Sequence, residues 1–212
     1  MQALFVHGLG RTPLSGLPLM ARLRRGGVRP LAFGYGAAWE DVAAIRARLV
    51  RRLVALAQSG GALEQGYVVI GHSLGGVLLR DALAALPAGV ARPRHVFLLG
   101  SPQTASRLAR ALRDRWVFRA WTRDCGRLLG SAQRMATIGA LAEPTTSIVG
   151  TRSLPLLRRW FGGEANDGVV AASEVGAPWI TDEVRVPLSH TWLPSSRQVS
   201  ELILRRLRGA AT

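Results

Sequence analysis

Cysteine, histidine and lysine are scarce or missing in this sequence. Its 212 residues include one cysteine, Cys125, and every one of the 28 basic residues is arginine. A single cysteine excludes an intrachain disulfide and is typical of a reducing compartment. Because no further cysteine and no histidine lies near Cys125, we expect no metal site there. No apolar run approaches the roughly 20 residues that a membrane-spanning helix needs.

The first residues lack the features of a secretory leader. Residues 1–6 carry neither a basic n-region nor a small-residue cleavage site, and they lead directly into an apolar run typical of a core strand. We therefore expect no signal peptide and a cytoplasmic location. We also predict no cofactor and no bound metal.

Acidic residues are half as frequent as basic ones. The chain has 13 acidic residues and a formal net charge of +15. Such a charge suits an anionic partner, either nucleic acid or a membrane surface; the other explanation is a compositional bias toward Arg, Ala, Gly and Leu. We find no nucleic-acid-binding motif and predict no nucleic-acid partner, while an anionic membrane surface stays an alternative. The arginines are spread over most predicted helices, for example Arg22, Arg24, Arg25, Arg46, Arg48, Arg51, Arg52, Arg205, Arg206 and Arg208.

Short apolar runs alternate with helical patterns along the whole chain. This alternation predicts an α/β fold, with a mostly parallel sheet of about six strands covered by helices on both faces. The length and the absence of any linker or repeat indicate one domain over residues 1–212. The expected strands are Ala3–His7, Pro30–Phe33, Tyr67–Gly71, His95–Leu99, Thr146–Val149 and Val184–Val186.

Three helices are expected between and after these strands. In the first, apolar residues recur at helical spacing on one face of residues 42–56, with the arginines largely on the other face. The second covers Leu74–Leu86 and ends near Pro87, and the third covers Ser195–Leu207.

Residues 103–144 interrupt the regular alternation. They place about forty residues between two strands, far more than a simple crossover needs. One interpretation is a crossover helix with a packed excursion. The other is a small cap over a site, with the aromatic side chains of Trp116, Phe118 and Trp121 toward an acyl group and the arginines toward solvent or lipid headgroups.

The strongest motif is Gly71-His72-Ser73-Leu74-Gly75-Gly76, between an expected strand and an expected helix. A serine on a sharp strand-to-helix turn is a nucleophile elbow, which lifts the hydroxyl into a cleft. Glycines two residues before and after the serine leave room where the strand and helix nearly meet. Glycine is abundant in this chain, so the pattern alone also fits an ordinary turn.

A serine nucleophile needs a base and an orienting carboxylate, here expected in the order serine, acid, histidine. Of four histidines, only His190 lies late in the chain, just after the last strand, so elimination selects it as the base. Asp167, in an Asp-Gly turn, is the preferred acid. The competing carboxylates are Glu143, Glu164, Glu174, Asp182 and Glu183.

The developing oxyanion needs backbone donors. One is expected from Leu74, directly after the serine, and the other from Leu9, in the glycine-containing loop His7-Gly8-Leu9-Gly10 after the first strand. For substrate binding we expect the neighbouring residues Gly8, Gly10, His72 and Trp192.

Four ordered motifs now resemble the α/β-hydrolase superfamily, and within it the small bacterial lipase- and esterase-like hydrolases. They are His7-Gly8-Leu9-Gly10, the elbow at residues 71–76, Asn166-Asp167-Gly168-Val169-Val170 and Ser189-His190-Thr191. They extend from the first residues almost to the last expected helix, so the resemblance covers nearly the whole chain. The resemblance implies a serine hydrolase in which Ser73 is the nucleophile, Asp167 the acid and His190 the base. The sequence departs from this family in two ways. The usual leading antiparallel hairpin is missing before the first strand. Secreted lipases of this kind often hold a calcium ion near the acid and base, but no carboxylate lies near residues 195–198 here, so we predict no calcium site.

The resulting prediction is a carboxylic-ester hydrolase that forms an acyl-enzyme on Ser73. The apolar residues Leu9, Leu14 and Leu17 favour a small-molecule ester with an apolar acyl group, and we favour a monomer. The alternatives are an acyltransferase or thioesterase with the same triad, and a non-catalytic module that retains the fold.

Overall fold

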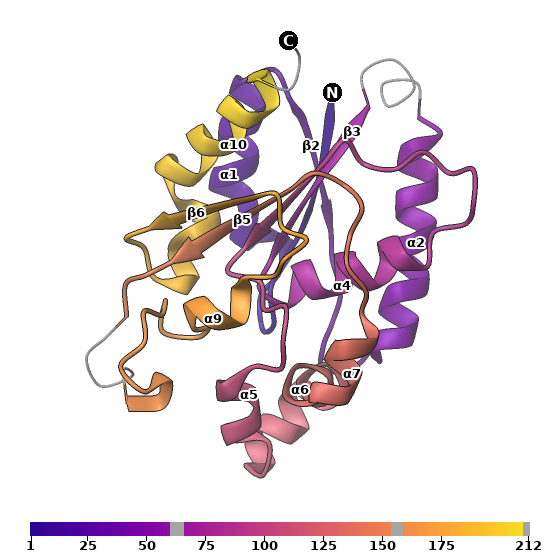
Figure 1. The fold of residues 1–212 in the computed structure, drawn as a ribbon. Coiled ribbons are helices and arrows are strands. Elements are labelled where there is room, and N and C mark those ends of the chain that lie inside the picture. Colours follow the sequence, from indigo (N-terminus) through magenta and orange to yellow (C-terminus); the bar gives the residue numbers. More distant parts are fainter. Residues whose placement is uncertain (60–65, 154–158, 210–212) are drawn as a thin grey trace.

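The computed structural model describes residues 1–59, 66–153 and 159–209. In this part of the chain, six parallel strands form one sheet in the order β2-β1-β3-β4-β5-β6 (Figure 1). The strands are β1 Gln2–Val6, β2 Arg29–Phe33, β3 Tyr67–His72, β4 His95–Leu99, β5 Thr145–Gly150 and β6 Asp182–Val186.

Helices connect these strands. The α-helices are α1 Leu17–Arg25, α2 Val42–Ala57, α4 Leu74–Ala84, α5 Arg107–Leu112, α6 Trp116–Gly130, α7 Ala132–Thr137, α9 Ala172–Val175 and α10 Arg197–Gly209. Short 3₁₀ turns lie at η1 Pro13–Gly16, η2 Arg159–Phe161 and η3 His190–Ser195.

The helices cover the sheet as two layers. Helices α1 and α10 lie together on one face, and α2 and α4 lie on the other (Figure 1). Alternate residues of β1 point to opposite faces, so Phe5 packs with Leu19 and Ile203 while Leu4 packs with Leu49. The central strands β1, β3 and β4 are buried almost throughout, which explains their continuous apolar sequences.

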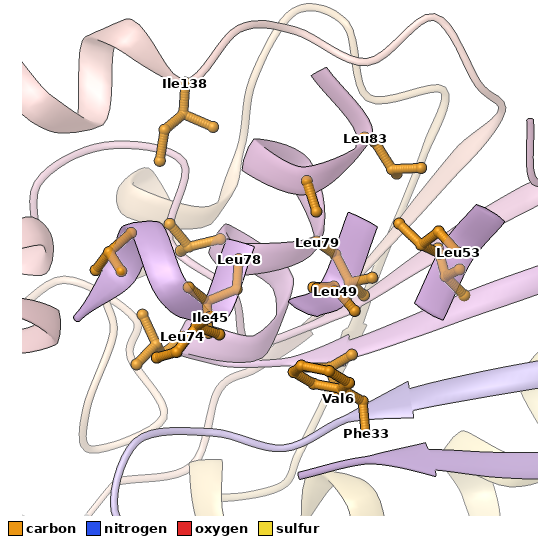
Figure 2. Packing of buried hydrophobic residues seen from close by; sticks show 14 of the residues in the cluster. Val6, Phe33, Ile45, Leu49, Leu53, Leu74, Leu78, Leu79, Leu83 and Ile138 are labelled. Atoms are coloured by element: carbon orange, nitrogen blue, oxygen red, sulfur yellow. The ribbon is translucent and has the colours of Figure 1, made fainter. Parts of the chain in front are cut away.

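Helix α2 shows how the sequence produces the larger core. Its buried residues recur every three or four positions and pack against α4 and the sheet (Figure 2). At its N-terminus, the side chain of Asp41 accepts a hydrogen bond from the Ala44 N–H at 2.7 Å, which caps the helix. The exposed arginines of this segment lie on the opposite face.

The strand order reverses direction between β1 and β3. The chain passes from β1 to the edge strand β2 and then returns to the other side of β1 to form β3. In open α/β sheets, ligands bind beyond the carboxyl ends of the strands at such a switch point. The loop at residues 7–10 follows β1 and Ser73 follows β3, so both motifs emerge there.

Residues 103–144 form the three helices α5, α6 and α7, which gather at one end of the molecule (Figure 1). The second half of α6 is part of the core, with Cys125, Leu128 and Leu129 buried. The first half leaves Trp116 and Trp121 exposed by 78% and 54%. The segment is therefore more than one crossover helix, and part of it packs while part faces outward.

The predicted fold class is confirmed. All six expected strands are present within one or two residues of their expected ends, and no antiparallel strand precedes β1 in the described residues. The expected helices at residues 42–56, 74–86 and 195–207 correspond to α2, α4 and α10. No helix within the described ranges is both long and apolar enough to cross a membrane.

Candidate active site

Ser73 occupies a sharp turn between β3 and α4. Its backbone has φ 53° and ψ −125°, a conformation that side-chain-bearing residues rarely adopt. A Cβ added at Gly71 would lie 2.4 Å from the Gly76 Cα, and one at Gly75 would lie 2.2 Å from the Val6 carbonyl oxygen. Glycine is thus required by close backbone approach at both positions, as expected for an elbow.

Asp167 and His190 form a buried hydrogen-bonded pair. The Nδ1–H of His190 donates to Oδ2 of Asp167 at 2.7 Å, and the two side chains are 8% and 2% exposed. The other carboxylate oxygen accepts the N–H groups of Val169 and Val170 at 3.0 and 2.8 Å. The backbone N–H of His190 also donates to the Asp167 carbonyl at 3.0 Å. These contacts fix the ring with its proton on Nδ1, which leaves Nε2 as the nitrogen able to accept a proton.

Two glycines that the sequence analysis did not single out make room for this pair. Gly100 has φ +53°, and a Cβ there would lie 3.0 Å from both Asp167 Oδ2 and His190 Nδ1. A Cβ at Gly150 would lie 2.7 Å from the Asp167 Cβ. Gly150 ends its strand and Gly100 directly follows one, so glycine at the carboxyl end of a predicted strand was the available signal.

The loop after β1 is held next to the serine. A Cβ at Gly8 would lie 3.0 Å from both the Ser73 Cβ and the His72 Nδ1. The ring of His7 stacks on Tyr35 at 4.2 Å, and its Nδ1–H donates to the Gly8 carbonyl. The Tyr35 hydroxyl donates to the His7 carbonyl at 3.0 Å, while burial lowers the pKa of His7 and keeps its ring neutral. These contacts order the backbone beside Ser73.

The two residues expected to donate to the oxyanion lie beside Ser73 in the chain, for Leu74, and in the loop after β1, for Leu9. Leu74 is the first residue of α4, so its N–H is not used by the helix, and its side chain is buried. Leu9 is half-buried against the core. The next residue, Gly10, has φ +64°, and a Cβ there would lie 2.1 Å from the ring of Trp121 on α6.

His72 contacts the histidine of the pair. It is 2% exposed, its Nε2–H donates to the His190 carbonyl at 3.1 Å, and the two ring centroids lie 4.8 Å apart. Burial, together with the proximity of His190, holds the pKa of His72 well below its usual range, so its ring is neutral. His72 therefore supports the backbone of His190, although the sequence analysis placed it among substrate-binding residues.

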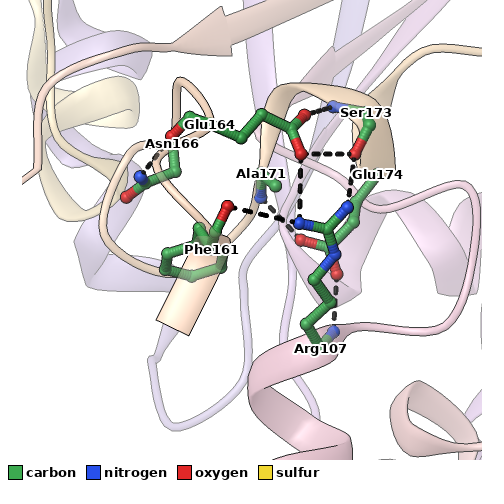
Figure 3. Close-up of polar contacts among 7 residues, drawn as sticks. All are labelled: Arg107, Phe161, Glu164, Asn166, Ala171, Ser173 and Glu174. Carbon is green, nitrogen blue, oxygen red and sulfur yellow. Dashed lines mark hydrogen bonds and ion pairs between the residues drawn. The ribbon is translucent and has the colours of Figure 1, made fainter. Parts of the chain in front are cut away.

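A polar network joins α5 to the loop that carries Asp167 (Figure 3). Arg107 forms an ion pair with Glu164 at 3.0 Å and donates to the Ser173 hydroxyl at 3.0 Å. The buried carboxylate of Glu174 accepts the backbone N–H groups of Ala171 and Arg107, both at 2.6 Å. Two of the competing acids, Glu164 and Glu174, thus position the segment around Asp167 and do not contact His190.

The remaining competing acids also have other partners. Glu143 pairs with Arg92 at 2.5 Å, Asp182 pairs with Arg206 at 2.9 Å, and Glu183 pairs with Arg185 at 3.1 Å.

A cavity of about 550 Å³ adjoins the pair. Asp167, His190, Leu188 and Trp192 line it, and Trp192 is 62% exposed. Ser73 is not among the described residues of its wall. Of the predicted substrate-binding residues, the structure therefore places Trp192 on this cavity, while Gly8 and Gly10 lie in the loop beside the serine and under Trp121.

Neither the single thiol nor a metal-ligand cluster offers a second reactive centre in the described residues. Cys125 is fully buried, and burial raises the pKa of its thiol to about 12, so it is protonated at neutral pH. Within residues 1–59, 66–153 and 159–209, no three His, Cys, Asp or Glu side chains are grouped to hold a metal ion. The expected absence of calcium and of cofactors stays a prediction.

The structure thus gathers the four sequence motifs at one end of the sheet. Asp167 and His190 are hydrogen-bonded, His72 links Ser73 to His190, and Gly8 lies against Ser73. No hydrogen bond joins the Ser73 hydroxyl to His190 within the described contacts. In ligand-free enzymes such contacts are often long and tighten only around a substrate.

An elbow serine, a buried Asp–His pair and a parallel sheet with this strand order define an α/β-hydrolase architecture. The chain belongs to the Alpha/beta hydrolase family, whose model matches residues 3–209. A comparison with curated proteins gives no match.

Solved structures with the same fold include several hydrolases. The lipase BlEst2 of Bacillus licheniformis, in mature form, matches with TM-score 0.79 and 16% identity, covering 97% of this chain and 91% of that one. The metagenomic carboxyl esterase MGS0156 matches with TM-score 0.71 and 18% identity, covering 100% and 75%. The RedJ thioesterase of Streptomyces coelicolor matches with TM-score 0.59 and 17% identity, covering 99% and 90%. At these identities the likeness is one of fold.

Proposed function

We propose that this protein is a serine carboxylic-ester hydrolase that acts through an acyl-enzyme on Ser73. The observation that carries the proposal is the buried 2.7 Å Asp167–His190 pair at the end of the sheet where Ser73 occupies its strained turn. A hydrogen-bonded Asp–His pair beside an elbow serine is the arrangement that serine acyl transfer requires.

Each group has one task in this reaction. The Ser73 hydroxyl attacks the ester carbonyl and gives its proton to Nε2 of His190, while Asp167 stabilises the imidazolium. The N–H groups of Leu74 and Leu9 donate to the carbonyl oxygen as it becomes negative. His190 then protonates the departing alcohol, which leaves the acyl group on Ser73. Water, deprotonated by His190, releases the free acid and restores the serine.

The cavity walls suggest the class of ester. Leu188, Val169 and Trp192 give the cavity beside His190 an apolar lining, and Arg152 adds a cation at its wall. Burial of apolar surface contributes about 25 cal/mol per Å² to binding. We therefore infer an ester with an apolar group in this cavity.

A series of p-nitrophenyl esters of increasing acyl length tests the function. We expect turnover by the wild type and a loss of about 10³-fold or more in Ser73→Ala. We expect no loss in Ser15→Ala, which replaces a half-buried serine of η1 whose hydroxyl donates to the Thr12 carbonyl. Equal turnover by wild type and Ser73→Ala would refute the proposal. No turnover of any ester, with no covalent labelling of Ser73, would favour a non-catalytic module.

Thioester hydrolysis is the second candidate, because the same groups serve both reactions and a thioesterase shares the fold. The ratio of kcat/KM for matched oxyesters and thioesters separates them. Competing alcohols separate hydrolysis from acyl transfer, since only transfer gives a new ester.

A further inference from the structure

An open pocket of about 460 Å³ lies between α5 and α6. It is distinct from the cavity beside His190, with which it shares no lining residue. Five of its lining residues are arginines and one is a phenylalanine, namely Arg110, Arg113, Arg119, Arg123, Arg127 and Phe118. No acidic residue is among its described lining residues.

Three of these five arginines have no ion-pair partner within the described residues, while Arg113 pairs with Asp114 at 3.5 Å. Eight arginines elsewhere pair with a carboxylate within 4 Å. In the pocket, the guanidinium groups of Arg110, Arg119 and Arg127 make no ion pair or hydrogen bond within the described residues. The nearby carboxylate of Asp124 is already occupied by Arg134, through contacts of 2.7 and 3.3 Å. The chain itself therefore leaves three of the five guanidinium groups in the pocket without a carboxylate partner.

The backbone at this pocket is strained. Arg123 has φ 43° and ψ −122° and interrupts α6. Ser73 is the other non-glycine residue with positive φ in the described ranges. The guanidinium of Arg123 donates to the Ala38 carbonyl at 3.2 Å, which connects the break in α6 to the loop before α2. Strain of this kind is found preferentially at ligand sites and persists where the surrounding structure holds it.

We propose that this pocket binds the phosphate group of an organic phosphate. Guanidinium groups form paired, charge-assisted hydrogen bonds that match phosphate oxygens. A dianionic ligand would also supply the negative charge that Arg110, Arg119 and Arg127 lack within the described residues. The volume of about 460 Å³ far exceeds the roughly 30 Å³ of one water molecule, and Phe118 offers a ring for an apolar portion, so the pocket suits more than inorganic phosphate. The proposal goes beyond ester hydrolysis and does not depend on it.

Two probes with the same phosphate chemistry distinguish its source. Phenyl phosphate represents a soluble ligand, and phosphatidylcholine vesicles containing 20% phosphatidic acid represent a lipid headgroup. Binding is measured by calorimetry for the first probe and by co-sedimentation for the second, on the full chain at fixed salt.

The test variant is Arg110→Gln/Arg119→Gln/Arg127→Gln, which removes the three unpaired guanidinium groups. The matched control is Arg24→Gln/Arg51→Gln/Arg52→Gln, which removes the same charge from exposed positions on α1 and α2. Circular dichroism and melting temperature establish that both variants fold.

We expect saturable binding of at least one probe by the wild type. The pocket variant should weaken it by at least about tenfold, since one charge-assisted contact is worth about that factor, and the control by less than threefold. Binding of phenyl phosphate assigns a soluble ligand, and binding of vesicles alone assigns a headgroup. Binding of neither probe, or equal weakening in both variants, would overturn the proposal.

Discussion

Replacing Asp167 by asparagine should cost this protein most of its activity and part of its stability. In the native site, Oδ2 accepts from His190 and Oδ1 accepts from Val169 and Val170, so all three partners are donors. An asparagine amide must point its NH₂ group at one of these sides. In one orientation the NH₂ group faces the two backbone N–H groups. In the other it faces Nδ1 of His190 and moves the ring proton to Nε2, so that Nε2 can no longer accept the proton of Ser73.

The expected magnitudes follow from these contacts. A histidine held in the wrong tautomer lowers kcat by about 10⁴-fold in serine enzymes. One buried donor left without an acceptor costs about 1–3 kcal/mol of folding free energy, which lowers the melting temperature by roughly 2–4 °C per kcal/mol for a domain of this size. The assay is the turnover of a p-nitrophenyl ester, with unfolding followed by circular dichroism.

The matched control is Asp182→Asn. It makes the same charge change at a carboxylate that pairs with Arg206 at the partly exposed edge of the sheet. Such a pair is worth about 0–1 kcal/mol, and it does not contact His190, so we expect kcat to stay within twofold. A folded Asp167→Asn protein with kcat within tenfold of the wild type would refute the assigned role of Asp167.

Three further predictions concern the surroundings of this pair. Gly100→Ala should lower kcat at least tenfold, because the added Cβ would lie 3.0 Å from Asp167 Oδ2 and His190 Nδ1. The control is Gly89→Ala, which has φ +83° and open space, and therefore carries the same backbone cost of about 1–2 kcal/mol without that contact. Equal kcat in both variants would contradict this account. Burial lowers the pKa of His72, so below pH 6.5 its imidazole is protonated in the unfolded chain but not in the native protein. The free energy of unfolding should therefore fall by about 1.4 kcal/mol per pH unit from pH 6.5 down to the native pKa of His72. Denaturant unfolding at pH 7 and 5.5 measures this fall, which His72→Gln should reduce. Glu174→Gln should cost about 1–3 kcal/mol of folding free energy, because its amide would face one of two backbone donors; an unchanged melting temperature would rule this out.

The fold was predictable because its elements carry local signals. Buried strands such as 67–71 have continuous apolar sequences, and the face of residues 42–56 repeats at helical spacing. The candidate Ser73, Asp167 and His190 came from motif order and from elimination among only four histidines. The structure then brings Asp167 and His190 into contact across 23 residues.

Other features depend on contacts between distant segments, which composition and spacing do not encode. The need for glycine at Gly100 arises from Asp167 and His190, far along the chain. In the sequence, Glu174 is only one of the carboxylates that compete with Asp167; its contacts with Arg107 and Ala171 give it a positioning role. The break at Arg123 has no local signal, because arginine is an ordinary helix residue.

The central claim is that Ser73 forms a covalent acyl-enzyme. Intact mass spectrometry of the full chain after treatment with a fluorophosphonate, followed by peptide mapping, tests it most directly. The account predicts one adduct per chain, located on Ser73, and its absence in Ser73→Ala. An adduct on another residue, or equal labelling of the Ser73→Ala protein, would contradict it.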